Sequence, residues 1–253
     1  MSDTVIAAQM YTVREFTKTP ADIAQTLAKL SQIGYRAVQL SALGPIDPAE
    51  LKGLLDKEGL IAACTHVGWN RLKEDLPGVI AEHETLGCRH IAVGSLPPSF
   101  RSAEGYVQFA KEASEVARGL QDAGLTFSYH NHDFEFERFG DRTGLQILIE
   151  ESDPALGFEI DTYWVQHGGG DPAAWIRRVA GRIPIVHVKD MTMRGREVLM
   201  AEVGEGNLNW PAILEACRSA NVEWYSVEQD ICQRDPFESL AISLRNLKGM
   251  GLS

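Results

Sequence analysis

The sequence predicts a single α/β domain over residues 1–253, folded as an eight-stranded (β/α)8 TIM barrel. Eight short apolar runs alternate with amphipathic stretches at a spacing of roughly 30 residues, which is the pattern of a parallel barrel. The length of 253 residues is that of one such barrel, and no linker-like segment divides the chain. The alternative is an open doubly wound sheet, but no glycine-rich phosphate loop follows the first run.

The eight expected strands are short, rich in Val, Ile and Ala, and bounded by polar loops, as buried parallel strands are. In chain order they cover residues 5–9, 37–41, 61–67, 90–95, 125–132, 156–161, 183–190 and 224–229.

Helices are expected between these strands. Three clear ones cover residues 20–34, 102–124 and 209–221. The second ends at Gly124, which suits a helix C-cap. The third has Asn209 as its N-cap and Pro211 in its first turn. The run GGGD at 168–171 is interpreted as a loop before a helix, with a phosphate contact as the alternative.

Composition narrows the class of protein. The formal net charge of −11, without a cluster of Lys and Arg, disfavours a nucleic-acid partner. The four cysteines are scattered and form no CxxC pair, which is typical of a reduced intracellular protein. The N-terminus has no signal-peptide pattern, and no apolar run approaches the ~18 residues of a membrane span. We therefore expect a cytoplasmic protein without a membrane partner.

Reactive side chains gather where the expected strands end. In a parallel barrel these ends meet at one mouth, which carries the active site. The side chains at the ends of expected strands three and five to eight are His66, His130, His132, Asp161, His187, Lys189 and Glu228. Because side chains alternate along a strand, His130 and His132 share one face with Ser128, and the larger apolar residues lie on the other.

Four of these side chains have the chemistry of a metal site. They are His130, Asp161, His187 and Glu228. They come from four successive strands, and two imidazoles with two carboxylates suit one divalent ion of manganese, zinc, cobalt or iron better than magnesium. Open coordination positions would receive water or substrate. For each residue taken alone, the alternative is a structural hydrogen bond or, for the aspartate, a helix cap.

Five motifs, in this order along the whole chain, resemble the sugar phosphate isomerase/epimerase superfamily of xylose isomerase-like barrels, which also contains ketose 3-epimerases, inosose dehydratases and endonuclease-IV-type enzymes. They are YHNHDFEF (129–136), GFEIDTYW (157–164), HVKD (187–190), VGEGNLNW (203–210) and SVEQD (226–230).

The resemblance implies roles for individual residues. In similar ketose epimerases a glutamate, an aspartate, a histidine and a second glutamate hold one metal ion. The last three fall on Asp161, His187 and Glu228, whereas the first falls on His130, so the paired-glutamate mechanism of those enzymes does not carry over unchanged. The DNA-repair branch has a histidine three residues after the aspartate, where this chain has Trp164, so DNA cleavage is not expected.

The expected function is a metal-dependent isomerase or epimerase that removes a proton next to the carbonyl of a sugar or sugar phosphate. Glu228 is the expected base, and His132 the second acid/base group. Lys189 would neutralise the enediolate or a phosphate; the alternative is a salt bridge to an acid such as Glu159.

Substrate contacts are expected from His66, Glu135 and Trp164, against purely structural roles for each. The first alternative function is a dehydratase or lyase on a keto-sugar or keto-cyclitol, and the second is a non-catalytic sugar-binding barrel. Expected partners are a small-molecule sugar or cyclitol and, by resemblance alone, a second copy in a homodimer. Whether the substrate is phosphorylated stays open at this stage.

Overall fold

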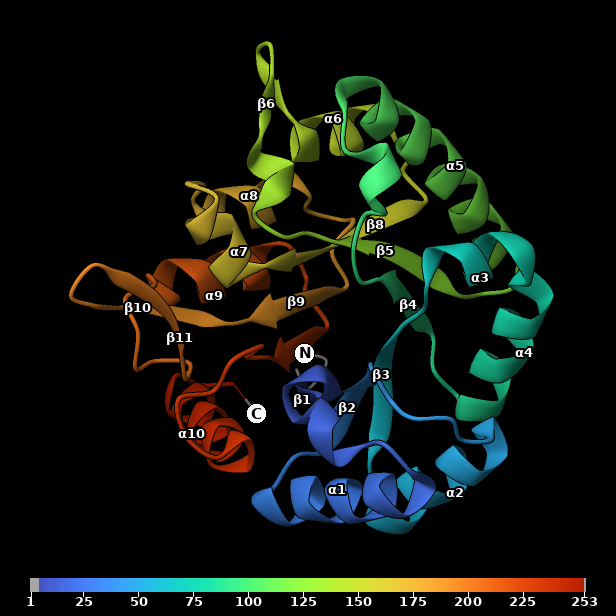
Figure 1. Cartoon of the computed structure of the whole chain (residues 1–253), viewed down its shortest axis with the longest axis vertical. Coiled ribbons are helices and arrows are strands. Elements are labelled where there is room, and N and C mark those ends of the chain that lie inside the picture. The colour runs from blue at the N-terminus through green and yellow to red at the C-terminus, as the bar shows by residue number, and fades with distance from the viewer. Residues whose placement is uncertain (1–4, 253) are drawn as a thin grey trace.

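The computed structural model describes residues 5–252 and contains the expected barrel (Figure 1). Its parallel strands close in the order β1-β12-β9-β8-β5-β4-β3-β2. They are β1 (Val5–Gln9), β2 (Ala37–Leu40), β3 (Ile61–His66), β4 (His90–Val93), β5 (Thr126–His130), β8 (Leu156–Asp161), β9 (Ile185–Val188) and β12 (Trp224–Val227). All eight expected strands are confirmed, with ends that differ by at most two residues.

Helices surround the barrel (Figure 1). The α-helices of the described residues are α1 (Pro20–Ile33), α2 (Pro48–Glu58), α3 (Trp69–Glu74), α4 (Leu76–Leu86), α5 (Ala103–Asp122), α6 (Gly144–Glu151), α7 (Thr162–His167), α8 (Pro172–Arg178), α9 (Trp210–Ser219) and α10 (Pro236–Gly249). Short 3-10 helices are η1 (Met10–Phe16), η2 (Pro98–Phe100) and η3 (Phe134–Phe136).

The helix ends follow from local chemistry. Thr19 and Asp22 form a reciprocal capping box at the start of α1. Asn209 accepts a hydrogen bond from the backbone of α9 and confirms the expected N-cap. Gly124, with φ +77°, follows the last residues of α5 and lets the chain turn in a left-handed conformation.

The glycine run at 168–171 is confirmed as a loop before a helix. Asp171 caps α8 through its side chain. A Cβ atom on Gly168 would lie 2.5 Å from the Phe136 ring, so this loop packs where a larger residue does not fit. Gly168 thus has a packing reason of its own.

The side chains inside the barrel are small and apolar at one end of its axis and polar at the other. Ala7, Ala37 and Ala63 pack together with Trp224 at the amino-terminal end. Towards the carboxyl ends of the strands the buried inward-facing side chains become polar, as at Gln39 and Glu159. The outward-facing side chains of β5 and β8, such as Phe127, Tyr129 and Phe158, belong to the main hydrophobic core. The expected alternation of faces is therefore confirmed, and it directs polar groups to one mouth.

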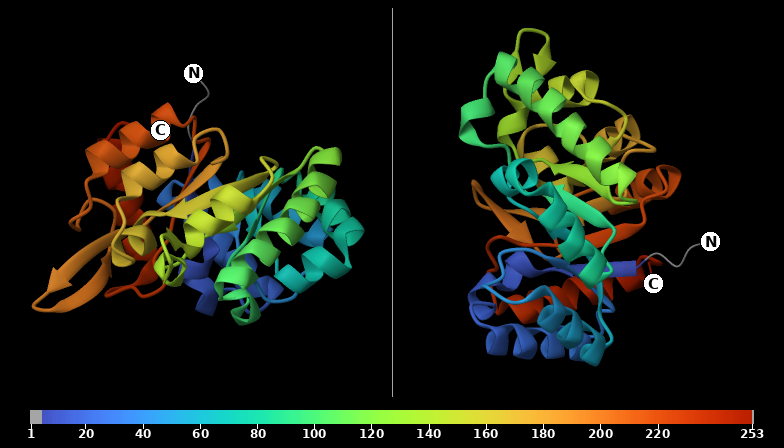
Figure 2. Two further views of the ribbon diagram at one scale, coloured as in Figure 1. Left: turned by 90° about the horizontal axis from the view of Figure 1, so that it is seen from above. Right: turned by 90° about the vertical axis from the view of Figure 1, so that its right-hand side faces the viewer.

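A hairpin that the sequence pattern did not predict follows β9. Its strands β10 (Asp190–Arg194) and β11 (Glu197–Ala201) pair antiparallel and extend away from the barrel (Figures 1 and 2). A much smaller hairpin, β6 (Arg138–Phe139) with β7 (Arg142–Thr143), precedes α6. Among the described residues, no helix is both long and apolar enough to cross a membrane.

Candidate metal and substrate site

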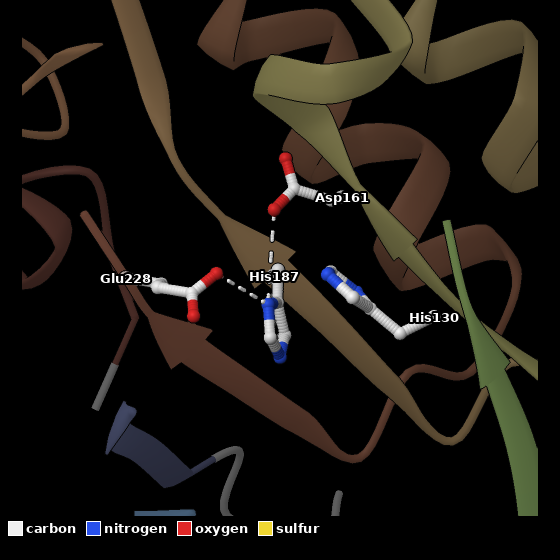
Figure 3. Close-up of side chains that lie close together, drawn as sticks. All are labelled: His130, Asp161, His187 and Glu228. Atoms are coloured by element: carbon white, nitrogen blue, oxygen red, sulfur yellow. Dashed lines mark hydrogen bonds and ion pairs between the residues drawn. The ribbon is translucent and has the colours of Figure 1, made fainter. Parts of the chain in front are cut away.

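Four side chains converge at the carboxyl-terminal mouth of the barrel (Figure 3). His130 ends β5, Asp161 ends β8, His187 lies in β9 and Glu228 directly follows β12. All four are buried, and each offers a nitrogen or oxygen atom within 4.8 Å of the others. The structure therefore brings together the four residues that the sequence predicted as metal ligands.

The distances within this cluster suit a shared cation. His187 Nδ1 lies 3.0 Å from Glu228 Oε2 and 3.7 Å from Asp161 Oδ2. The ring centroids of His130 and His187 are 4.4 Å apart. His130 Nδ1 and Asp161 Oδ2 are buried without a hydrogen-bond partner in the described structure. Buried polar atoms of this kind normally have partners, so the donor set fits a divalent ion.

Lys189 supplies the fixed positive charge beside the cluster. Its ammonium group is fully buried, 3.1 Å from Glu228 Oε2 and 3.5 Å from Asp161 Oδ2, and it also pairs with Asp230. Burial lowers the pKa of a lysine, but here Asp161 and Glu228 outweigh burial and raise it. Lys189 is thus a permanently charged neighbour of the site.

The surrounding charges divide the histidines into two kinds. Burial lowers the pKa of His130 well below its usual range, and lowers that of His132 to about 4. Both imidazoles are therefore neutral near pH 7. Burial also disfavours charge on His187, but Glu159 and Glu228 outweigh it and raise its pKa well above the ordinary value. For Glu228, burial is likewise outweighed by Lys189 and His187, so its pKa is lowered and it stays ionised.

A cavity of about 440 Å³ opens directly in front of the cluster. It is lined by Tyr11, Ser41, Ala42, His66, Val67, Gly68, Trp69, Val93, Gly94, Ser95, His130, His132, Glu228 and Asp230. A cavity of this size accommodates one monosaccharide or cyclitol ring.

Comparison with known proteins shows the family to which this barrel belongs. Residues 27–248 match the family described as the xylose isomerase-like TIM barrel. This chain belongs to that family. A sugar phosphate isomerase/epimerase from Parabacteroides distasonis ATCC 8503 superposes with a TM-score of 0.81 at 21% identity, over 100% of this chain and 96% of that one. L-ribulose 3-epimerase superposes with a TM-score of 0.72 at 19% identity, over 100% and 95% of the two chains. These two structures share the fold.

Two curated proteins are similar in sequence. The rhizopine catabolism protein MocC of Rhizobium meliloti is 26% identical over 89% of this chain and 81% of its own length. The inosose dehydratase of Geobacillus kaustophilus (strain HTA426) is 27% identical over 66% of this chain and 61% of its own length. The chain thus spans about three fifths of that dehydratase.

Within this xylose isomerase-like barrel, the expected substrate contacts fall in different places. His66 and His132 line the cavity. Trp164 lies beside His132, with 5.5 Å between ring centroids, and its ring faces the Lys189 ammonium at 5.0 Å. It is not among the residues that line the cavity in this structure.

Glu135 also has a different position from the one expected. Its carboxylate is fully buried in η3 and accepts hydrogen bonds from the Tyr129 hydroxyl and from the backbone N–H of His132. Both oxygens are thus engaged away from the cavity. Glu135 holds the His132 backbone in place through one of these hydrogen bonds.

Sequence reasoning did not identify the partners of Lys189 and Glu159. Lys189 forms the salt bridge that was given as its alternative role, but its partners are Asp161, Glu228 and Asp230 and not Glu159. Asp230 follows Glu228 by two residues, and this spacing was the available signal. Glu159 instead bonds to Gln39 across the barrel, at 2.8 Å, and a polar residue inside an apolar strand run was the only hint of that partner.

Proposed function

We propose that this chain is a divalent-metal-dependent enzyme that removes the proton next to the carbonyl of a keto-sugar or keto-cyclitol. The convergence of His130, Asp161, His187 and Glu228 in front of a ring-sized cavity carries the proposal. A bound divalent cation would polarise the carbonyl and balance the negative charge of the developing enediolate.

Glu228 is the base in this proposal. It lines the cavity, so it reaches the substrate directly. Its pairing with Lys189 at 3.1 Å keeps the carboxylate ionised and oriented at neutral pH. The neutral imidazole of His132 lies on the same cavity and serves as the second proton-transfer group. Negative charge on the reacting substrate would raise the pKa of His132 while a proton moves to it.

The charges around the cavity favour an unphosphorylated substrate. The described residues that line it include Glu228 and Asp230 but no Lys or Arg. Arg14 approaches the rim, where its guanidinium donates to the carbonyl oxygens of Tyr11 and Asp230. Lys189 is already paired with three carboxylates. A phosphate dianion would therefore meet carboxylates instead of free cations.

Two overall reactions can follow removal of this proton. Isomerisation or epimerisation is the first candidate, and dehydration is the second. The two proton-transfer groups are unlike: Glu228 is an ionised carboxylate and His132 a neutral imidazole. Epimerisation is best served by two matched groups on opposite faces of the substrate, whereas elimination needs one base and a separate acid for the leaving hydroxyl. The similarity to an inosose dehydratase supports dehydration as the second candidate.

Exchange of deuterium from the solvent tests the step that these reactions share, which is removal of the proton next to the carbonyl. The Mn²⁺-loaded protein is incubated in D2O with ketohexoses, ketopentoses and inososes, and NMR follows the carbon next to the carbonyl. We expect deuterium at that carbon in at least one compound, loss of exchange in Glu228→Gln, and no exchange with the phosphorylated counterpart. The product then separates isomer, epimer and dehydrated ketone. Protein that holds about one metal ion per chain and exchanges none of these compounds would contradict the proposal.

A further inference from the structure

A buried polar relay lies one layer deeper in the barrel than the four candidate ligands. It consists of Gln39 on β2 and Glu159 on β8, both completely buried. Glu159 precedes Asp161 by two residues, so the strand pleat turns both carboxylates inward at successive levels. The deeper carboxylate therefore lies directly beneath the candidate site.

His187 connects the two levels through its two ring nitrogens. Nδ1 faces the upper level, 3.0 Å from Glu228 Oε2. Nε2 faces the lower level, 2.9 Å from Gln39 Oε1 and 3.3 Å from Glu159 Oε2. In the neutral imidazole only one nitrogen carries a proton. The other nitrogen presents its lone pair either to the upper level, from Nδ1, or to the lower level, from Nε2.

The relay determines that position. Gln39 Nε2 donates to Glu159 Oε1 at 2.8 Å. The reversed amide would place the Gln39 oxygen against the Glu159 carboxylate, which means two acceptors face to face. With the amide fixed, Gln39 Oε1 is turned to His187 Nε2, and a carbonyl oxygen can only accept. His187 Nε2 must then carry the proton, which leaves the Nδ1 lone pair directed at the upper cluster.

We propose that Glu159, acting through Gln39, is a positioning residue that holds His187 as the Nε2–H tautomer, so that Nδ1 is the metal-ligating atom. This inference rests on the proposed function, because it concerns the metal of that site. Partners in the shell around a metal ligand orient it and set its tautomer, and their loss typically costs about 10- to 100-fold in metal affinity.

The neighbours of Glu159 argue against a second ion at the lower level. His66, Glu159 and His187 also lie close enough to form a ligand set. However, Glu159 Oε2 is already 2.7 Å from His66 Nε2, and its Oε1 is occupied by the Gln39 amide. The protein itself thus satisfies this carboxylate.

The first test uses the unmodified protein. Histidine-selective ¹⁵N NMR of the Zn²⁺-loaded chain distinguishes a protonated, a free and a metal-bound ring nitrogen. We expect His187 to show metal at Nδ1 and a proton at Nε2, with about one Zn²⁺ per chain. Zn²⁺ bound through Nε2, or a second Zn²⁺ that disappears in Glu159→Gln, would overturn the positioning role.

The second test measures Zn²⁺ affinity by competition with a chelating dye. In Glu159→Gln the new amide no longer fixes the Gln39 orientation, so we expect a 10- to 100-fold loss of affinity and a mixture of His187 tautomers. Ser226→Ala is the matched control, because Ser226 pairs in register with His187 and its hydroxyl has no hydrogen-bond partner in the described structure. It should leave the affinity unchanged.

The outcomes separate the inference from the proposed function. Unchanged affinity and tautomer in a folded Glu159→Gln protein would overturn the inference alone. If the tautomer is as expected but no keto-sugar or keto-cyclitol exchanges its proton, only the proposed reaction is wrong. An unmodified protein that binds no Zn²⁺ would overturn both. If Glu159→Gln does not fold, the NMR spectrum of the unmodified protein still tests the inference, because Zn²⁺ bound through His187 Nε2 would overturn it.

Discussion

Glu135 should make the stability of the folded protein depend on pH, and Glu135→Gln should remove that dependence. Burial raises the pKa of this carboxyl group from 4.5 to about 7, although the Tyr129 hydroxyl and the N–H of His132 both donate to it. Its pKa in the unfolded chain is the ordinary 4.5. The folded state therefore keeps a proton that the unfolded state has already released. The resulting stabilisation is complete below the lower pKa and is lost as pH rises through the higher one.

The size of the effect follows from this difference in pKa. At 1.36 kcal/mol per pKa unit, a rise from 4.5 to about 7 corresponds to about 3 kcal/mol over the full range. Part of this free-energy change falls outside the pH range that is convenient for an unfolding experiment. Between about pH 5.5 and 8.5, linkage gives a loss of about 2 kcal/mol in the free energy of unfolding from Glu135 alone.

Urea unfolding followed by tryptophan fluorescence measures this loss. We expect the free energy of unfolding of the unmodified protein to fall by about 2 kcal/mol relative to Glu135→Gln between the two ends of that window. Tyr129→Phe removes one donor to the carboxylate, so it should move the pH effect to higher pH. A difference between unmodified protein and Glu135→Gln that stays constant across the window would refute the reasoning.

Four further substitutions have definite expected outcomes. His130→Glu replaces a nitrogen donor with oxygen and should shift metal preference from Zn²⁺ towards Mn²⁺, measured by competition for the site. Asp190→Ala removes the acceptor of three loop N–H groups and an indole N–H, so a loss on the order of 3 kcal/mol in the free energy of unfolding is expected by urea titration. Gly53→Ala, with open space at its Cβ, should stabilise α2 by up to about 1 kcal/mol. Gly105→Ala places its Cβ 2.4 Å from the Phe100 carbonyl oxygen and should lower the melting temperature instead.

The barrel and the four-residue cluster were predictable because both depend on short-range patterns. Each strand is a compact apolar run, and parallel strands bring their carboxyl ends to one mouth. Once the eight runs are recognised, His130, Asp161, His187 and Glu228 need no further information to converge. Their inward direction follows from the alternation of side chains along each strand.

The deeper partners were not predictable, because they depend on contacts across the barrel. Gln39 and Glu159 are 120 residues apart and meet through the closed shape of the sheet. The register of β2 against β3 also shifts between Val38 and Gln39, which no sequence pattern indicates. Glu135 was expected as a substrate contact because it follows the end of β5, but the 3-10 turn folds its carboxylate back onto Tyr129.

The balance of charge at the mouth gives a physical reason for a bound cation. Asp161, Glu228 and Asp230 place three carboxylates around a single ammonium group, that of Lys189, and a fourth carboxylate, that of Glu159, lies against His187. Buried charges without compensation are costly. Without a metal ion, protons provide part of the compensation. Glu159 and Glu228 raise the pKa of His187 against the effect of burial, and burial together with Glu228 raises that of Asp230.

A divalent ion would take over this role from the protons. Ligation at His187 Nδ1 requires the neutral imidazole, so metal binding must release the proton that the surrounding carboxylates hold there. Binding should therefore become tighter as pH rises. The relay beneath the site matters for the same reason: when His187 gives up one proton, Gln39 and Glu159 ensure that the proton remaining on the ring is the one on Nε2.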